Sequence, residues 1–274
     1  MKIVCTMAVR DEADVIEQNI RHHLRQGVDS FIITDNGSID GTREILQHYA
    51  ATGLVHIIDE PVHDKTQFRW VTNMARQGAR EGADWILNID ADEFWFPKDR
   101  RLIVRDVLTM APPEVSKIRV NRDHLIGFPY YGAKNNWQYR LIWRNRETRN
   151  IRGNPLGAKI AHRADADVVI AQGNHAASGP LLGDVSAIEP LEILEVQVRS
   201  WRQFHRRVEN AGSAYESSTH FGPNRGNAVR TEYELLQTGQ LDQWYRQQCV
   251  DWPRLVSGLQ AGTVVPDFRV LTRK

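Results

Sequence analysis

Short apolar runs and segments with helical spacing alternate over the first hundred residues. Four apolar runs predict strands over residues 2–9, 30–34, 54–58 and 85–89. Between them, apolar side chains recur every three to four positions, which predicts helices over residues 12–26, 41–51 and 66–81. This alternation of strand and helix is typical of a parallel sheet. Because the strands are apolar almost throughout, rather than at every second position, helices are expected to cover both faces of the sheet.

The pattern is looser in the second half of the chain. Further strands are predicted over residues 117–121, 137–144, 157–162, 168–171 and 188–196, and helices over residues 200–217 and 231–248. The sequence shows no internal repeat, and no linker is clear enough to divide it. We therefore expect a single α/β domain over residues 1–274, with a mostly parallel central sheet. Its parts are residues 1–100, residues 101–198 and a C-terminal helical extension over residues 199–274.

Composition and charge narrow the class of protein. The chain has 274 residues, of which 41% are hydrophobic and 25% charged, as in an ordinary globular protein. These values exclude a disordered chain, a collagen-like chain and a small disulfide scaffold. The net charge of +1 does not favour nucleic-acid binding. Residues 1–100 carry 11 Lys+Arg against 17 Asp+Glu, whereas residues 101–274 carry 24 against 17, which suggests two different binding roles.

The cysteines and the N-terminal residues indicate the cellular compartment of the protein. Cys5 and Cys249 are too few for a disulfide framework or a zinc site, and we expect both to be reduced. The first apolar run ends at Val9, which is short for a signal peptide. No stretch approaches the ~18 apolar residues of a membrane span. We expect a cytoplasmic protein, attached at most to the inner face of a membrane.

Polar side chains follow each of the four N-terminal strands. Arg10-Asp11-Glu12 follows the first, residues 35–38 the second, residues 63–67 the third and residues 90–93 the fourth. In parallel α/β sheets, ligands bind at the carboxyl ends of the strands. Asp35 is suited to accept hydrogen bonds from a base or a ribose. Asp40 is equally suited to contacting a ligand and to capping the following helix.

The acidic motif at residues 90–93 carries the sharpest chemical signal. Asp90 and Asp92 are two residues apart, so in an extended segment their side chains point the same way. Two like charges held together are costly unless a cation offsets them. Oxygen ligands of this kind suit Mg²⁺ or Mn²⁺. The alternative interpretation is an ordinary acidic turn after a strand.

Together these pieces resemble the family-2 glycosyltransferases. The resemblance rests on the strand that begins at Lys2, on Arg10-Asp11-Glu12, on residues 35–42 (DNGSIDGT) and on residues 90–94 (DADEF). Residues 65–73 are similar to the segment that this subgroup carries before its metal motif. Weaker similarities lie at residues 173–175 and 198–200. Several members carry a His shortly before the Arg-Ser pair, where this chain has residues 195–198 (EVQV).

The resemblance implies a GT-A fold and an inverting transfer from a nucleotide-diphosphate sugar to a glycan, lipid-linked or other glycoconjugate acceptor. It implies a Mn²⁺ or Mg²⁺ ion bound by Asp92. It also implies that residues 1–100 bind the donor and the metal, and that residues 101–198 bind the acceptor. Asp90 would contact the ribose or the sugar. The implied donor-binding residues are Arg10, Glu12, Asp35, Asn36, Lys65, Gln67, Arg69 and Asp90.

The catalytic base and a second metal ligand each have more than one interpretation. Inversion in one step needs a base for the acceptor hydroxyl, and the candidates are Asp123, Asp184 and Glu195, with Asp123 and Asp184 preferred. Each of them is also an ordinary loop or strand carboxylate. His175, in a Gly-Asn-His turn, is a candidate second metal ligand, because imidazole suits Mn²⁺. It equally fits a turn histidine that bonds to nearby backbone.

Two clusters in the second half have both functional and structural interpretations. The aromatic residues Phe128, Tyr130, Tyr131, Trp137, Tyr139 and Trp143 could stack on a sugar, although ordinary packing is favoured. The basic residues Arg199, Arg202, His205, Arg206 and Arg207 could meet an anionic acceptor, a phosphate or an anionic membrane. A solvated helix face explains them equally well.

Two other functions compete with glycosyl transfer. A sugar nucleotidyltransferase would need a glycine-rich basic loop after the first strand to cradle a triphosphate, and Arg10-Asp11-Glu12 offers no glycine and two acids. A non-catalytic module of the same fold would bind a nucleotide or a carbohydrate without turnover. The intact acidic motif argues against that module.

Overall fold

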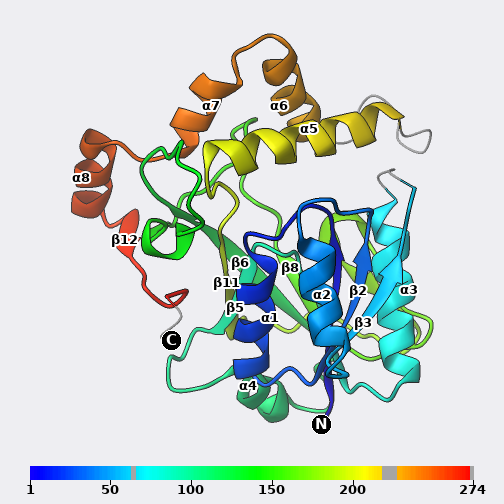
Figure 1. The fold of residues 1–274 in the computed structure, drawn as a ribbon. Coiled ribbons are helices and arrows are strands. Elements are labelled where there is room, and N and C mark those ends of the chain that lie inside the picture. Colours follow the sequence, from blue (N-terminus) through cyan, green and yellow to red (C-terminus); the bar gives the residue numbers. More distant parts are fainter. Residues whose placement is uncertain (63–65, 218–226, 272–274) are drawn as a thin grey trace. The chain divides into compact units, whose positions relative to one another are not determined.

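The structure, a computed structural model, describes residues 1–62, 66–217 and 227–271 (Figure 1). The chain divides into two compact units. Unit 1 comprises Met1–Arg122 and Gly157–Ile193, and unit 2 comprises Asp123–Leu156 and Leu194–Lys274. Strand β6 (Lys117–Ile126) and strand β11 (Leu191–Glu195) each pass from one unit into the other along the chain. The expectation of a single domain with three segments stays a prediction.

Unit 1 is an α/β unit. Its first strands are β1 (Ile3–Val9), β2 (Ser30–Asp35), β3 (Val55–Asp59) and β4 (Trp85–Asn88), and its first helices are α1 (Ile16–Arg25), α2 (Thr42–Ala50) and α3 (Gln67–Arg80). Strand β5 (Glu93–Pro97) and helix α4 (Val104–Met110) follow. After β6, the chain returns as β8 (Lys159–Arg163), the short pair β9 (Val169–Ile170) and β10 (Ala177–Ser178), and the one-turn helix η2 (Gln172–Asn174).

The sheet of unit 1 has the strand order β6-β8-β4-β1-β2-β3. Strands β3, β2, β1 and β4 are parallel, and β8 is antiparallel to both β4 and β6. Both faces of β1, β2 and β4 are buried, as their continuous apolar runs predict. On one face, Val4, Ile32 and Ile86 pack against Val71 and Met74 of α3. The predicted α/β fold with a mostly parallel central sheet is confirmed.

Unit 2 is mainly helical. It contains the one-turn helix η1 (Trp137–Tyr139), strands β7 (Trp143–Asn145) and β12 (Val264–Pro266), and helices α5 (Trp201–Ser217), α6 (Asn227–Gln237), α7 (Leu241–Gln248) and α8 (Trp252–Ala261). Strand β7 pairs antiparallel with β12 and with the end of β6. Phe204 and Val208 of α5 pack against Leu241 and Tyr245 of α7. The Tyr245 hydroxyl donates to the Tyr130 carbonyl oxygen at 3.0 Å, which ties α7 to the loop after β6.

Two sequence predictions in this half are wrong. Residues 137–144 do not form one strand, because a helical turn occupies Trp137–Tyr139 and only Trp143–Asn145 is extended. The predicted helix over residues 231–248 is two helices, α6 and α7. They are separated at Gly239, whose φ of 72° is left-handed and ends the first helix.

Within the three described ranges, no helix is both long and apolar enough to cross a membrane.

Candidate functional site

The loops that follow β1 and β2 are bonded to one another. The Arg10 guanidinium donates to the Asn36 carbonyl oxygen. The Asp11 carboxylate accepts from the Ile39 amide at 2.8 Å, and the Glu12 amide donates to the Thr42 hydroxyl at 2.8 Å. These bonds fix the carboxyl ends of two neighbouring parallel strands, where a ligand is expected.

The predicted donor residues in these loops already have structural partners. Asp35 is buried, and its Oδ1 accepts from the Ser38 amide at 3.1 Å. The Asn36 amide nitrogen donates to the carbonyl oxygens of Glu60 and Val62, at 2.9 and 2.7 Å, and so links β2 to the end of β3. Asp40 accepts from the amide and the hydroxyl of Thr42, which favours its structural role.

Asn19 of α1 holds the turn that carries the acidic motif. Its side chain is fully buried, and its amide nitrogen donates to the carbonyl oxygens of Ala91 at 2.9 Å and Glu93 at 2.8 Å. The same nitrogen lies 3.4 Å from the Asp90 carbonyl oxygen. The turn therefore depends on a helix more than seventy residues earlier in the sequence.

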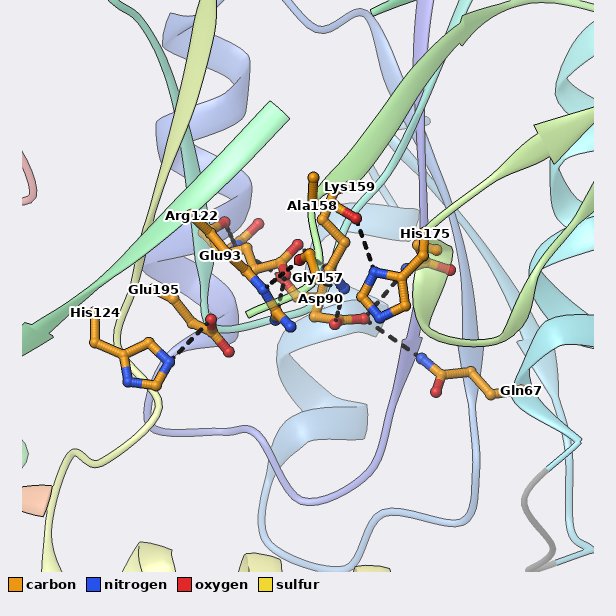
Figure 2. Close-up of polar contacts among 12 residues, drawn as sticks. Gln67, Asp90, Glu93, Arg122, His124, Gly157, Ala158, Lys159, His175 and Glu195 are labelled. Carbon is orange, nitrogen blue, oxygen red and sulfur yellow. Dashed lines mark hydrogen bonds and ion pairs between the residues drawn. The ribbon is translucent and has the colours of Figure 1, made fainter. Parts of the chain in front are cut away.

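Asp90 and Glu93 form a charge cluster with two cations that the sequence analysis missed (Figure 2). Lys159 of β8 donates to Asp90 Oδ2 and lies 3.0 Å from Glu93 Oε1. Arg122 of β6 lies 3.4 Å from the same Glu93 oxygen. Glu93 Oε2 accepts from the Asp90 amide at 3.1 Å. Two carboxylates and two cations thus balance one another inside unit 1.

Lys159 is charged in this environment. Its burial alone would lower its pKa, but the carboxylates of Asp90 and Glu93 outweigh that effect and raise the pKa above its ordinary value. Little in the sequence pointed to this residue, since Lys159 begins a short strand that also contains His162 and Arg163. The partner itself could not be named, because Asp90 lies 69 residues earlier.

Two further groups complete the surroundings of Asp90. Gln67, the first residue of α3, donates to Asp90 Oδ1 at 3.4 Å, and Asn174 donates to the same oxygen at 3.3 Å. Asn174 has a φ of 62° and Asp11 a φ of 57°, the two left-handed non-glycine residues within the described ranges. Such conformations cost free energy, and they cluster at functional sites. Both lie at the carboxyl end of the sheet.

Asp92 and His175, the predicted metal ligands, differ in their surroundings. Asp92 is half-buried in the turn. His175 Nδ1 lies 2.7 Å from the Ala158 carbonyl oxygen, so this nitrogen carries the proton and Nε2 presents its lone pair. Partial burial, the largest cause, lowers the His175 pKa. A Cβ on Gly157 or Gly173 would lie 2.7 Å from this ring, and the φ of 73° at Gly173 also favours glycine there.

The predicted metal ligands have the donor chemistry that a divalent ion requires. Across the described part of the chain, no group of three or more His, Cys, Asp or Glu side chains is placed to hold a metal. Mg²⁺, however, is commonly held by one or two carboxylates together with substrate phosphates. Asp92 offers a carboxylate and His175 a neutral imidazole nitrogen, a donor set that also suits Mn²⁺.

The remaining predicted residues are spread over both units. Lys65 lies outside the described residues, and Arg69 is exposed. Asp184 is exposed in unit 1 and has no hydrogen bond or ion pair with a described residue. In unit 2, Asp123 Oδ2 accepts from Arg144 Nε at 2.7 Å, and buried Glu195 lies 3.2 Å from His124 Nε2.

The basic segment of residues 199–207 does not form one solvated face. Arg199 is buried and donates to the Val196 carbonyl oxygen at 3.2 Å. Arg207 lies 3.0 Å from Glu232 of α6. The structure therefore uses these two cations inside unit 2, and the expected contact with an anionic membrane stays a prediction.

The aromatic residues differ in how deeply they are buried. Trp137 is fully buried and serves the core of unit 2, whereas Tyr131 and Tyr139 are exposed. The Tyr131 hydroxyl donates to Asp242 at 2.6 Å, so this ring is fixed at the surface. Packing explains Trp137, and the exposed tyrosines remain candidates for sugar contact.

Comparison with known proteins identifies the family. Residues 2–177 match the model of glycosyltransferase family 92. A glycosyltransferase family 92 protein of Oryza sativa subsp. japonica is 31% identical over 127 residues, which cover 42% of this chain and only 20% of that protein. Among solved structures, S. aureus TarS 1–349 is similar with a TM-score of 0.46 and 10% identity, covering 95% of this chain and 79% of that one. TarS 1–349 in complex with UDP-GlcNAc gives a TM-score of 0.47 and 9% identity over the same shares. The sequence resemblance is therefore confirmed at the level of glycosyltransferases and corrected in its family: the chain belongs to glycosyltransferase family 92, not to family 2.

Proposed function

We propose that this chain transfers a sugar from a nucleotide-diphosphate sugar to a glycan or another glycoconjugate, with inversion and with the help of Mn²⁺ or Mg²⁺. The observation that carries the proposal is the charged site at the carboxyl ends of β1, β2 and β4 in a chain of glycosyltransferase family 92. The two left-handed residues, Asp11 and Asn174, support it, because strain of this kind is retained where a ligand is bound.

The donor half of the proposal assigns roles to the strand ends. Asp35 accepts from the base or the ribose, and Asp90 accepts from a hydroxyl of the ribose or the sugar. Arg10 and Glu12 lie beside the nucleotide, with Asn36 keeping that loop in place. Gln67 and Arg69, together with Lys65, line the donor pocket.

A divalent ion, when bound with the donor, supplies positive charge that stabilises the departing nucleoside diphosphate. Asp92 is the carboxylate that would hold it, and His175 the imidazole. The Ala158 carbonyl oxygen fixes the His175 tautomer by accepting from Nδ1, an arrangement that histidine ligands commonly share. Mn²⁺ is the favoured ion, because it accepts a nitrogen ligand more readily than Mg²⁺ does.

The transfer step needs a base beside the acceptor. The acceptor hydroxyl oxygen attacks the anomeric carbon, the bond from that carbon to the diphosphate oxygen breaks, and the diphosphate leaves with the electron pair. The hydroxyl proton passes to a carboxylate. Asp184 and Asp123 are the two candidates: Asp184 has no ion pair among the described residues but lies beside Ser116 and Lys117 at the start of β6, and Asp123 is held by Arg144.

The proposal is tested with a thermal-shift panel of UDP, GDP, CDP, TDP and their sugars, with and without Mn²⁺. A ligand that binds only the folded protein raises the melting temperature by mass action. We expect one nucleotide to give a metal-dependent shift that is lost in Asp92→Asn. Glu114→Gln, an exposed acid on the loop before β6, is the matched control and should keep the shift.

Turnover decides between an enzyme and a binding module. The nucleotide identified in the panel is supplied as its sugar, and release of the nucleoside diphosphate is followed with and without glycan acceptors. Release in the wild type but not in Asp92→Asn supports the transferase. Binding without release under any acceptor would favour a non-catalytic module, and no shift with any nucleotide would overturn the proposal.

A further inference from the structure

Lys159 is one of the most buried side chains of the protein, with a relative exposure of 1%. Its two acidic neighbours are Asp90, which is 29% exposed, and Glu93, which is 0% exposed. A buried ammonium is costly unless carboxylates pair with it, and this one is paired twice. Together with Arg122, the four charges sum to zero.

The strand register explains why Lys159 meets the acidic motif. Strand β8 is antiparallel to β4, with Leu87 opposite Ala161. Continued by two residues, that register carries Lys159 to the segment that follows β4, where Asp90 lies. On its other side Lys159 is paired with Val120, so Arg122 is only two residues further along β6. The pairing of the strands therefore brings these charged side chains together.

Three protein donors contact the Asp90 carboxylate. Oδ2 accepts from Lys159, and Oδ1 accepts from Gln67 and Asn174. A metal ion at Asp90 would have to displace the ammonium, and the buried charge of Lys159 would lose one of its two partners. Asp90 is therefore poorly placed to bind a metal ion.

A neighbouring group points to a ligand at Asp90. The amide oxygen of Asn174 is buried and accepts no hydrogen bond within the described part of the chain. Buried polar atoms are normally hydrogen-bonded, so a donor from a bound molecule is the natural partner. Asn174 also holds its left-handed backbone at this position. A sugar or ribose hydroxyl could donate to either oxygen, that of Asn174 or the exposed edge of Asp90.

We propose that Lys159 is a positioning residue: it holds Asp90 as a hydrogen-bond acceptor for a donor hydroxyl and keeps the divalent ion off Asp90, so that the ion binds through Asp92. This inference rests on the proposed function for the identity of the donor. The exclusion of metal from Asp90 is independent of the donor, and it can be measured with metal alone.

The experiment is a titration of the full chain with Mn²⁺ alone, followed by the electron paramagnetic resonance signal of the free ion. The variants are Lys159→Met, Lys159→Arg, Asp90→Asn and Lys159→Met/Asp90→Asn. We expect Lys159→Met to bind Mn²⁺ at least tenfold more tightly than the wild type, because it leaves Asp90 and Glu93 without their shared cation. Lys159→Arg should bind as weakly as the wild type, and the double variant should lose most of the gain.

A purely structural lysine would not produce this result, since a loosened site gains no metal affinity. No gain in folded Lys159→Met would overturn the inference. If that variant does not fold, Asp90→Asn alone decides: unchanged Mn²⁺ affinity supports the inference, and a loss as large as that of Asp92→Asn overturns it. The proposed function is tested separately, by nucleotide binding and turnover. If both are absent, the Mn²⁺ titration still tests the role of Lys159.

Discussion

Asn19→Ala is the substitution whose effect follows most directly from the structure. The side chain is fully buried on α1, and it donates to two carbonyl oxygens of the turn that contains Asp92. Its own Oδ1 lies 2.9 Å from His23 Nδ1. Alanine removes the donor from both carbonyl oxygens.

The expected cost can be worked from these bonds. Leaving one buried acceptor unsatisfied costs about 1–3 kcal/mol, so two acceptors cost about 2–6 kcal/mol. Alanine is the better helix former, but by at most about 0.7 kcal/mol. The net loss in the free energy of unfolding should therefore exceed about 1 kcal/mol. Asn19→Asp keeps the shape but turns a carboxylate towards two carbonyl oxygens, so it should cost at least as much.

The loss is measured by urea unfolding, followed by both tryptophan fluorescence and circular dichroism, because coincident transitions test two-state behaviour. Gln47→Ala is the matched control, since Gln47 is an exposed polar residue on α2 and surface changes stay within about 0.5 kcal/mol. If Asn19→Ala is as stable as this control, Asn19 does not hold the turn. Loss of the nucleotide-induced thermal shift in Asn19→Ala would connect the turn to donor binding.

Two further predictions concern pH and packing. The pKa of His162 is lowered to about 4, first by burial, so between about pH 6.5 and pH 4 the unfolded chain takes up a proton that the folded chain refuses. Stability should fall by up to about 3 kcal/mol across that window, and His162→Gln should flatten the dependence of the urea midpoint on pH; an unchanged slope would contradict this. Gly127→Ala would place Cβ 2.5 Å from the Arg140 carbonyl oxygen and should cost about 1–3 kcal/mol, whereas exposed Gly183→Ala should leave the thermal midpoint unchanged. Equal midpoints for the two glycine variants would refute the packing argument.

The sequence alone predicts the four parallel strands of the sheet. The apolar runs that predict strands over residues 2–9, 30–34, 54–58 and 85–89 differ from β1–β4 by at most one residue at either end. Strands buried on both faces need unbroken apolar runs, and few other structures produce them at this spacing. The polar residues at the strand ends followed from the same argument.

What the sequence could not predict depends on contacts between distant segments. Strand β8 enters the sheet beside β4 in the antiparallel direction, and no local pattern fixes that neighbour. The pairing of Lys159 with Asp90 could not be predicted for this reason. The predicted strand over residues 137–144 failed because alternation of Trp137 and Tyr139 with polar residues fits a helical turn with one buried side equally well.

Lys159 removes the electrostatic need for a metal at Asp90. The sequence alone predicts a cation beside two neighbouring carboxylates, and a divalent metal has that charge. In the structure Asp90 and Glu93 are neutralised by Lys159 and Arg122, so that requirement is met by the protein. Asp92 alone offers too little charge to hold a divalent ion tightly without further oxygen ligands. On the proposed function, the diphosphate of the donor would supply those ligands. If Lys159 acts as proposed, it keeps a divalent ion from Asp90, and this gives a reason for a buried lysine beside the acidic motif.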